Sequence, residues 1–213
     1  MMRIAKIFLI FLGLWTAVGC TGGAGNGTVH GPVSIESCNL EKEDFNLDVN
    51  FFTATYSNNT MIIRIQHTSE LQSYVDGITI EVRDVEAVSE HLGDPLEIEL
   101  IPSLDTFLET GPVGAVGKNA GVPLTAYASP ARATLFLNRT CPDNSLAFAD
   151  GTGTITFDSI YRPGKGKKIS AVFELRFFDP RTWEAPGEIR DTATMMGDFE
   201  FGYSRNPQEQ PFL

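Results

Sequence analysis

The sequence predicts an all-β fold, either an antiparallel β-sandwich or a barrel-like single domain with one or two short helices. Apolar and polar residues alternate along many short segments, which is the period of half-buried strands. Turn residues separate these segments at short intervals, as in sandwiches and barrels. Helical periodicity is scarce, and only the segments 84–93 and 103–111 show it.

The first predicted strands form a β-hairpin. Residues 51–56 alternate between two faces, residues 57–60 supply turn residues, and Met61, Ile63 and Ile65 resume the alternation. Two further segments place apolar side chains on one face and polar or charged ones on the other. Their apolar faces consist of Ile78, Ile80 and Val82 in the first, and of Leu96, Ile98 and Leu100 in the second.

The remaining strands lie in the second half of the chain. One, with Ala133, Leu135 and Leu137 on one face, leads towards Cys141. A second hairpin is the clearest of all, with a turn at 162–167 between two strands. Its inward side chains are Ile155 and Phe157, then Ile169, Ala171, Phe173, Leu175 and Phe177. A last strand carries Phe199, Phe201 and Tyr203, so that at least eight strands are expected.

The first helical segment has the better end signals. Asp84 is a candidate N-cap, Val85, Val88 and Leu92 share one helical face, and Gly93 is a stop signal. The segment 103–111 repeats this logic, and a loop is the alternative for both. Residues 111–130 are rich in Gly, Pro and Ala, and a loop of that length is expected to be functional or mobile.

The N-terminus carries the pattern of a targeting segment. Arg3 and Lys6 precede an apolar run over 7–18, which is shorter than the ~20 residues of a membrane-spanning helix. The run ends in Ala17-Val18-Gly19-Cys20, so that residues 1–19 resemble the signal peptide of a β-rich bacterial lipoprotein of the Gram-negative kind. An ordinary secretory cleavage site is the alternative.

The resemblance implies an anchor and an address. Cys20 would be lipidated, with palmitate-type acyl chains that hold the protein permanently on a membrane. Thr21 follows it in place of the Asp that retains lipoproteins in the inner membrane, so an outer-membrane lipoprotein facing the periplasm or the cell surface is expected. Residues 20–32 would form the lipidated cysteine with a glycine-rich tether, and residues 33–213 the β-sandwich domain.

The cysteine count fits this interpretation. Three cysteines in an exported chain leave one thiol over, and lipidation of Cys20 removes it. Cys38 and Cys141 then remain for one intramolecular disulfide, which suits an oxidising compartment. No Cys-x-x-Cys pair is present, so the bridge is expected to be structural.

The charge of the chain excludes one class of partner. The full chain has a net charge of −11, and loss of Arg3 and Lys6 with the signal peptide makes it more negative still. A nucleic-acid partner is therefore not expected, because binding phosphates requires an excess of Lys and Arg.

Motifs for catalysis and cofactors fail on their spacing. The segment 111–119 has the glycines and lysine of a phosphate-binding loop, but the glycine spacing is wrong and Asn119 stands where Ser or Thr is needed. Neither a nucleophile elbow nor a zinc-protease motif occurs. His30 is expected in the tether, and His67 and His91 in solvated loops. No enzymatic activity and no cofactor are predicted.

Three groups of residues are candidates for ligand contacts. Asp143, Asn144 and Asp150 form an acidic cluster that is a weak candidate for calcium. Arg162, Lys165, Lys167 and Lys168 form a basic turn that either is merely solvated or contacts anionic envelope polymers. Trp183 either plugs the end of the sandwich or stacks on a sugar or peptide.

Three functions follow, in order of preference. The first is a lipid-anchored structural or interaction module of the cell envelope, with a membrane and an envelope protein or glycan as partners. The second is a glycan- or peptide-binding module, calcium-assisted or not, which uses Trp183 and residues 111–130. The third is an envelope hydrolase, which would need a deep pocket holding His67 or His91 beside carboxylates.

Overall fold

The computed structural model describes residues 25–98, 131–142, 149–178, 183–185, 188–189 and 192–203. Within them the chain is all-β with short helices, as the alternation predicts. The strands are β1 (Gly25–Ile35), β2 (Leu40–Asn46), β3 (Phe51–Ser57), β4 (Thr60–Gln66), β5 (Asp76–Val82), β6 (Pro95–Ile98), β7 (Ala131–Leu137), β8 (Ala149–Ser159), β9 (Lys168–Phe178), β10 (Trp183–Ala185), β11 (Glu188–Ile189) and β12 (Thr192–Gly202). The helices are η1 (Glu36–Cys38), η2 (Gln72–Tyr74) and α1 (Val85–Glu90).

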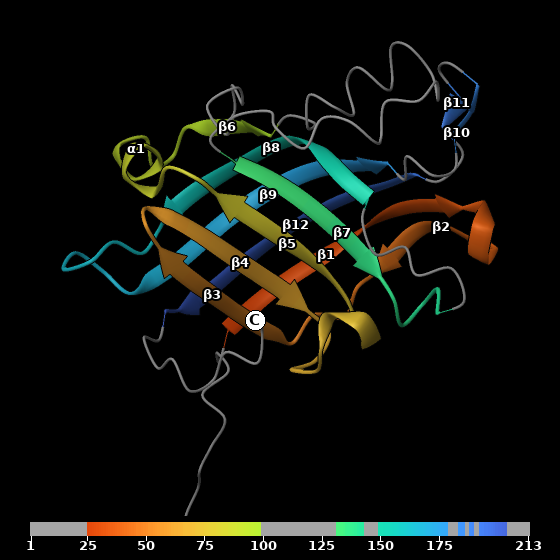
Figure 1. Ribbon diagram of the computed structural model, residues 1–213, viewed down its shortest axis with the longest axis horizontal. Helices are drawn as coiled ribbons and strands as arrows, with labels where there is room; N and C mark the ends of the chain where they lie inside the picture. Colours follow the sequence, from red (N-terminus) through yellow and green to blue (C-terminus); the bar gives the residue numbers. More distant parts are fainter. Residues whose placement is uncertain are drawn as a thin grey trace, which may run out of the picture.

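One antiparallel sheet of ten strands makes up most of the described structure. Its order is β2-β1-β12-β9-β8-β7-β5-β4-β3. β8 pairs with β7 through residues 149–151 and with β6 through residues 153–156. β10 and β11 pair only with each other. The sheet curls, so that β3, β4, β5 and β7 cross over β1, β12, β9 and β8 (Figure 1). The architecture is a half-barrel made by one sheet facing itself, which lies between the two predicted forms.

The short connection between β2 and β3 explains why the sheet curls. These two strands are the opposite edges of the sheet, yet only residues 47–50 join them. The backbone N–H of Leu47 donates to Val29 O of β1 at 3.0 Å, and that of Asn50 donates to Gln66 O of β4 at 3.1 Å. Since an extended connection of this length reaches at most about 18 Å, the two edges have to come close.

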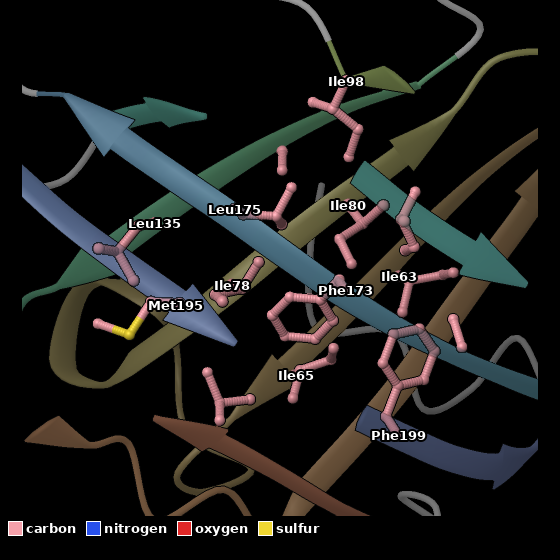
Figure 2. Close-up of a cluster of buried hydrophobic side chains, with 14 of the residues drawn as sticks. Ile63, Ile65, Ile78, Ile80, Ile98, Leu135, Phe173, Leu175, Met195 and Phe199 are labelled. Carbon is pink, nitrogen blue, oxygen red and sulfur yellow. The ribbon is translucent and has the colours of Figure 1, made fainter. Parts of the chain in front are cut away.

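The core fills the space between the two halves of the sheet. Figure 2 shows isoleucines of β4 and β5, among them Ile63 and Ile80, facing Phe173 of β9 and Phe199 of β12. All the apolar residues predicted to face inwards on β4, β5, β7, β9 and the end of β12 are buried. Burial of each such side chain contributes about 1.5–3 kcal/mol, so this face stabilises the whole fold.

Both predicted hairpins are confirmed. In the first, β3 pairs with β4 from Phe51 opposite Gln66 to Ser57 opposite Thr60. Asn58 and Asn59 have φ angles of 50° and 63°, which is the left-handed pair that a tight hairpin turn requires. In the second, β8 pairs with β9 along most of their length, and the turn falls where the basic residues predicted it.

The helix at 84–93 is confirmed, and it is shorter than the pattern suggested. Asp84 caps α1 through its side chain, which accepts a hydrogen bond from Ala87 N at 2.9 Å. Gly93 ends the segment with a φ of 87°, a conformation that favours glycine. The prediction for Leu92 is wrong, because α1 stops at Glu90 and leaves that side chain 44% exposed. The segments 103–111 and 111–130 lie outside the described residues.

The predicted tether is wrong from Gly25 onwards. Residues 25–32 belong to β1, which pairs with β12 over its whole length, and only 20–24 lie outside the described residues. Gly25 and Gly27 do not belong to a linker, because they allow close packing against the neighbouring strand and the opposing half of the sheet. A Cβ on Gly27 would lie 2.5 Å from Asp198 O and 2.9 Å from the ring of Phe52. Small residues at these inward positions let β12 and the opposing half of the sheet approach.

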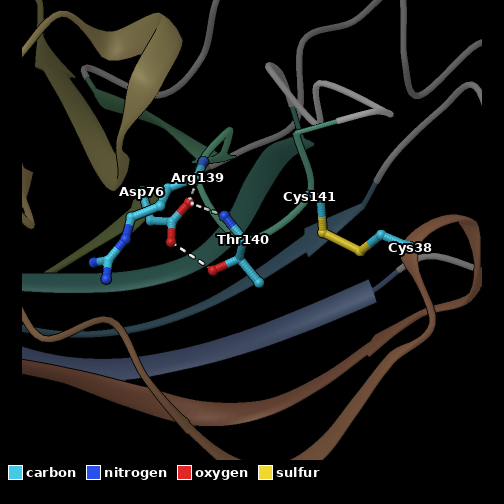
Figure 3. Close-up of a disulfide and its surroundings, with 5 residues drawn as sticks. All are labelled: Cys38, Asp76, Arg139, Thr140 and Cys141. Atoms are coloured by element: carbon cyan, nitrogen blue, oxygen red, sulfur yellow. Dashed lines mark hydrogen bonds between the residues drawn. A yellow bond between two sulfur atoms is a disulfide. The ribbon is translucent and has the colours of Figure 1, made fainter.

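The predicted disulfide between Cys38 and Cys141 is confirmed, with a Cα–Cα distance of 5.6 Å. It ties η1 to the segment that follows β7 (Figure 3). Beside it, the buried carboxyl of Asp76 accepts hydrogen bonds from Arg139 N at 2.9 Å, Thr140 N at 3.0 Å and the Thr140 hydroxyl at 2.6 Å. The carboxyl thus fixes the turn that delivers Cys141 to Cys38.

Candidate functional site

The two halves of the sheet differ in how much of their outer face is accessible. On β7, Thr134 and Phe136 point away from the core, because Leu135 and Leu137 point into it, yet Phe136 is 0% exposed. On β9, the outward side chain of Val172 is 50% exposed. The outer face of β8, β9, β12 and β1 is therefore the more open of the two.

A groove of about 1020 Å³ crosses this open face. Five neighbouring strands contribute to it, since β8, β9, β12, β1 and β2 follow one another in the sheet. The lining side chains are mostly hydroxyls and charges, and the register brings them into rows: Arg176 of β9 stands between Thr152 of β8 and Thr194 of β12. The lining residues are Pro32, Val33, Ser34, Glu41, Lys42, Glu43, Thr152, Gly153, Thr154, Glu174, Arg176, Thr192 and Thr194.

Gly153 shapes the floor of this groove. Its φ of 135° is a conformation that residues with a side chain rarely adopt, and a Cβ there would lie 2.2 Å from Glu174 O. The glycine lets β8 and β9 come close between the two threonines that flank it, Thr152 and Thr154. The neighbouring hydroxyls are thereby held on a rigid pair of strands.

Most of the groove hydroxyls are available to a ligand. Thr152 donates its hydroxyl to Ile98 O at 3.0 Å, which attaches β6 to the rim of the groove. For Thr154, Thr192 and Thr194 no hydrogen bond of the side chain occurs within the described part of the chain. Each of these hydroxyls can both donate and accept, so the row is suited to a ligand that is itself rich in hydroxyls.

Charged groups stand beside the hydroxyls. Arg176 lies over the ring of Phe178, with 4.8 Å between the guanidinium carbon and the ring centroid, and this contact orients the guanidinium. Glu174 lies two positions before it on the same strand, and β2 adds Lys42 between two glutamates. None of these groups forms an ion pair with another described residue. The groove therefore presents both donors and acceptors with full charge.

Two of the four cations of the basic turn form ion pairs. Arg162 lies 3.2 Å from Glu86 of α1, and Lys168 lies 2.8 Å from Glu200 of β12. Lys165 and Lys167 are exposed and make no ion pair within the described ranges. The four residues lie at the β8–β9 turn as predicted, but the structure leaves only two of the four charges for a partner.

A second, smaller pocket holds His91. It has a volume of about 250 Å³ and is lined by Ala87, Val88, His91, Asp94, Pro95, Leu96 and Phe157. The imidazole Nδ1 of His91 lies 3.6 Å from the carboxylate of Asp94, and both side chains are more than two-thirds exposed. A histidine beside a carboxylate is two-thirds of a hydrolytic triad, but the lining offers no hydroxyl or thiol to act as nucleophile.

The other two histidines have structural partners. His30 lies in β1 and not in a tether, and its Nδ1 is 2.9 Å from the carboxylate of Asp44. His67 is less solvated than expected, because its side chain is 17% exposed and its Nδ1 lies 2.9 Å from Asp48 O. Neither histidine lines the groove or the pocket that holds His91.

Two of the predicted groups of ligand contacts, Trp183 and the acidic cluster, lie next to or partly outside the described residues. Trp183 lies in β10, which pairs with β11 and not with the large sheet. Asp150 lies in β8, paired with Thr134 and Phe178, whereas Asp143 and Asn144 lie outside the described residues. Among the described residues, no group of three or more His, Cys, Asp and Glu could hold a metal ion.

Sequence patterns did not identify the groove. Its threonines alternate with buried residues and look like any solvated strand face, and nothing local shows that β1 and β12 lie beside β9. The signal that could have found it is the repeated threonine on Thr152 and Thr154, and again on Thr192 and Thr194, at strand spacing. Such pairs predict two neighbouring hydroxyls on one face of each strand.

No family model, curated protein or solved structure matches this chain. None of the helices in the described ranges is long and apolar enough to span a membrane.

Proposed function

We propose that this chain is a lipid-anchored binding module of the bacterial cell envelope, and that it holds a glycan in the groove on the outer face of β8, β9, β12, β1 and β2. The observation that carries the proposal is the groove itself: about 1020 Å³, open, and lined by a row of threonine hydroxyls around Arg176. The anchor at Cys20 is part of the proposal and is supported by the lipobox-like sequence.

The chemistry of the groove favours a sugar chain over a peptide. An extended peptide is usually bound along a sheet edge, where main-chain groups are exposed, whereas four of the five strands of the groove (β1, β12, β9 and β8) have neighbours on both sides. Sugar hydroxyls can pair with Thr154, Thr192 and Thr194, which both donate and accept. Arg176 and Glu174 would add charge-assisted hydrogen bonds to carboxylate or amino groups of the sugar.

Binding is also better supported than hydrolysis. The pocket that contains His91 offers no nucleophile among its lining residues, so it does not supply a histidine-based hydrolytic site. The proposal therefore keeps the expectation of a non-catalytic interaction module. It moves the ligand site from Trp183 and residues 111–130 to the threonine-lined groove.

Binding of purified envelope glycans to the chain tests this function. Isothermal titration with peptidoglycan fragments and lipopolysaccharide oligosaccharides should give a Kd in the millimolar range or tighter. Arg176→Ala should weaken binding about tenfold or more, since it removes a charged hydrogen-bond donor. Thr194→Val should weaken it roughly three- to tenfold, because it removes one hydroxyl and keeps the shape.

Thr53→Val is the matched control. Thr53 is a partly exposed threonine on the outer face of β3, outside the groove, and the same substitution there should leave the Kd unchanged. Failure of every envelope glycan to bind at millimolar concentration would rule out the proposed ligand. An equal loss of affinity for Thr53→Val and Thr194→Val would rule out the proposed site.

A further inference from the structure

The β8–β9 turn and the N-terminal end of β1 leave the sheet at the same end. β1 is antiparallel to β12 and β12 is antiparallel to β9, so β1 and β9 run in the same direction. Gly25, the first residue of β1, pairs with Phe201, which in turn pairs with Ile169 near the start of β9. The turn residues 160–167 precede β9 and therefore project from the end of the sheet at which β1 begins (Figure 1).

The chain between Cys20 and β1 is short. Gly25 comes five positions after Cys20, and a fully extended connection of that length spans at most about 18 Å. A tether up to residue 32 would have let the domain move freely above the membrane, but residues 25–32 are paired in the sheet. An anchor at Cys20 would thus hold this end of the sheet close to the bilayer surface.

The same end carries the two lysines of the basic turn that form no ion pair with another described residue. Lys165 at the tip of the turn and Lys167 next to β9 are exposed, whereas Arg162 and Lys168 are neutralised by Glu86 and Glu200. Each Lys or Arg near an anionic membrane surface adds to the attraction between the protein and the lipids. The chain as a whole is acidic, with a net charge of −11, so anionic lipids repel most of its surface and attract this tip.

We propose that Lys165 and Lys167 dock the β8–β9 turn on anionic phospholipid headgroups of the membrane that holds Cys20. This rests on the lipid anchor that forms part of the proposed function. Docking also sets the distance between the groove and the membrane. Arg176 lies eight positions after Lys168 along β9, which puts it roughly 27 Å further from the headgroups when the strand stands upright. The groove would then lie above the headgroups and open to the side of the domain.

Lysine footprinting on reconstituted protein tests the docking. The full chain is expressed in a bacterial host, extracted from membranes and examined by mass spectrometry for an acylated Cys20. It is then reconstituted into phosphatidylcholine vesicles with or without phosphatidylglycerol, and amine acetylation is quantified at each lysine. Lys165 and Lys167 should react roughly five- to tenfold more slowly on the anionic vesicles, and high salt should abolish the difference.

Lys42 is the internal control, because it lies in the groove on β2 and should react equally on both vesicles. In the double variant Lys165→Glu, Lys167→Glu, the tip should lose its attraction, and Lys168 should then react equally on the two vesicle types. Equal reaction of Lys165 and Lys167 on both vesicles overturns the docking and leaves the anchor intact. An unmodified Cys20 overturns the anchor and the docking together, while glycan binding by the groove is measured separately in solution.

Discussion

The two ends of the half-barrel are held by different forces. At the disulfide end, Cys38 is bonded to Cys141 and the buried carboxyl of Asp76 fixes the adjoining turn. At the hairpin end, the ring of Tyr161 stacks on that of Tyr203 at 3.8 Å between centroids and meets Tyr56 edge-on at 5.4 Å. One end is thus closed by a covalent bond and buried hydrogen bonds, the other by aromatic packing.

The two ends differ because the chain follows a different path at each of them. At the disulfide end the chain leaves the sheet in an irregular segment after β7, where the regular backbone hydrogen bonds stop and the carboxyl of Asp76 accepts from Arg139 and Thr140 instead. At the hairpin end residues 160–167 link β8 to β9, and the buried side chains of Tyr161 and Tyr203 cover the core. At the hairpin end Lys165 and Lys167 are exposed and form no ion pair with another described residue, which is why we place the membrane contact there.

Removal of the disulfide should have the largest effect. The bridge spans 103 residues, and in the chain-entropy model a loop of about 100 residues contributes about 4–5 kcal/mol to the free energy of unfolding. Cys38→Ser with Cys141→Ser should therefore lower that free energy by about 4–5 kcal/mol in urea titrations. Cys20→Ser is the control and should not change it, since Cys20 takes no part in the bridge.

Truncation of Tyr161 should have the second-largest effect, and it measures how much the aromatic packing at the hairpin end contributes to the free energy of unfolding. The side chain is 5% exposed, and loss of a buried aromatic ring to alanine costs about 3–4 kcal/mol. Tyr161→Ala should lower the free energy of unfolding by that amount in the same titrations. Tyr161→Phe keeps both ring contacts and should cost less than about 1 kcal/mol. If Tyr161→Ala destabilised more than loss of the disulfide, the hairpin end would be the stronger of the two.

The fold was predictable because its signals are local. Period-two alternation identified the strands around Ile63, Ile80 and Phe173, and Asn58 and Asn59 marked a hairpin turn whose geometry only a few residues adopt. Cysteine counting paired Cys38 with Cys141. Each of these inferences needs only residues that are neighbours in sequence or a chemical inventory of the chain.

The tether and the groove were missed because they depend on long-range pairing. Gly25 and Gly27 have the composition of a linker, and only the ring of Phe52 across the core and the neighbouring strand β12 explain why glycine stands there. In the same way, Thr194 becomes part of a site only when β12 lies beside β9. Sequence periodicity gives the face of a strand but not the identity of its neighbours.

Replacement of Asp76 should have the smallest of the three effects and tests the hydrogen-bonded part of the disulfide end. Asp76→Ala leaves Arg139 N, Thr140 N and the Thr140 hydroxyl without their acceptor, which should lower the free energy of unfolding by about 2–3 kcal/mol. Asp44→Ala is the matched control, because that carboxylate is 76% exposed and its pair with His30 contributes less than about 1 kcal/mol. Equal costs for the two substitutions in urea titrations would mean that the turn is held by the disulfide alone. A smaller cost for Asp76→Ala when Cys38 and Cys141 are also replaced would show that the carboxyl and the bridge support each other, whereas a larger cost would show that either one alone can hold the turn.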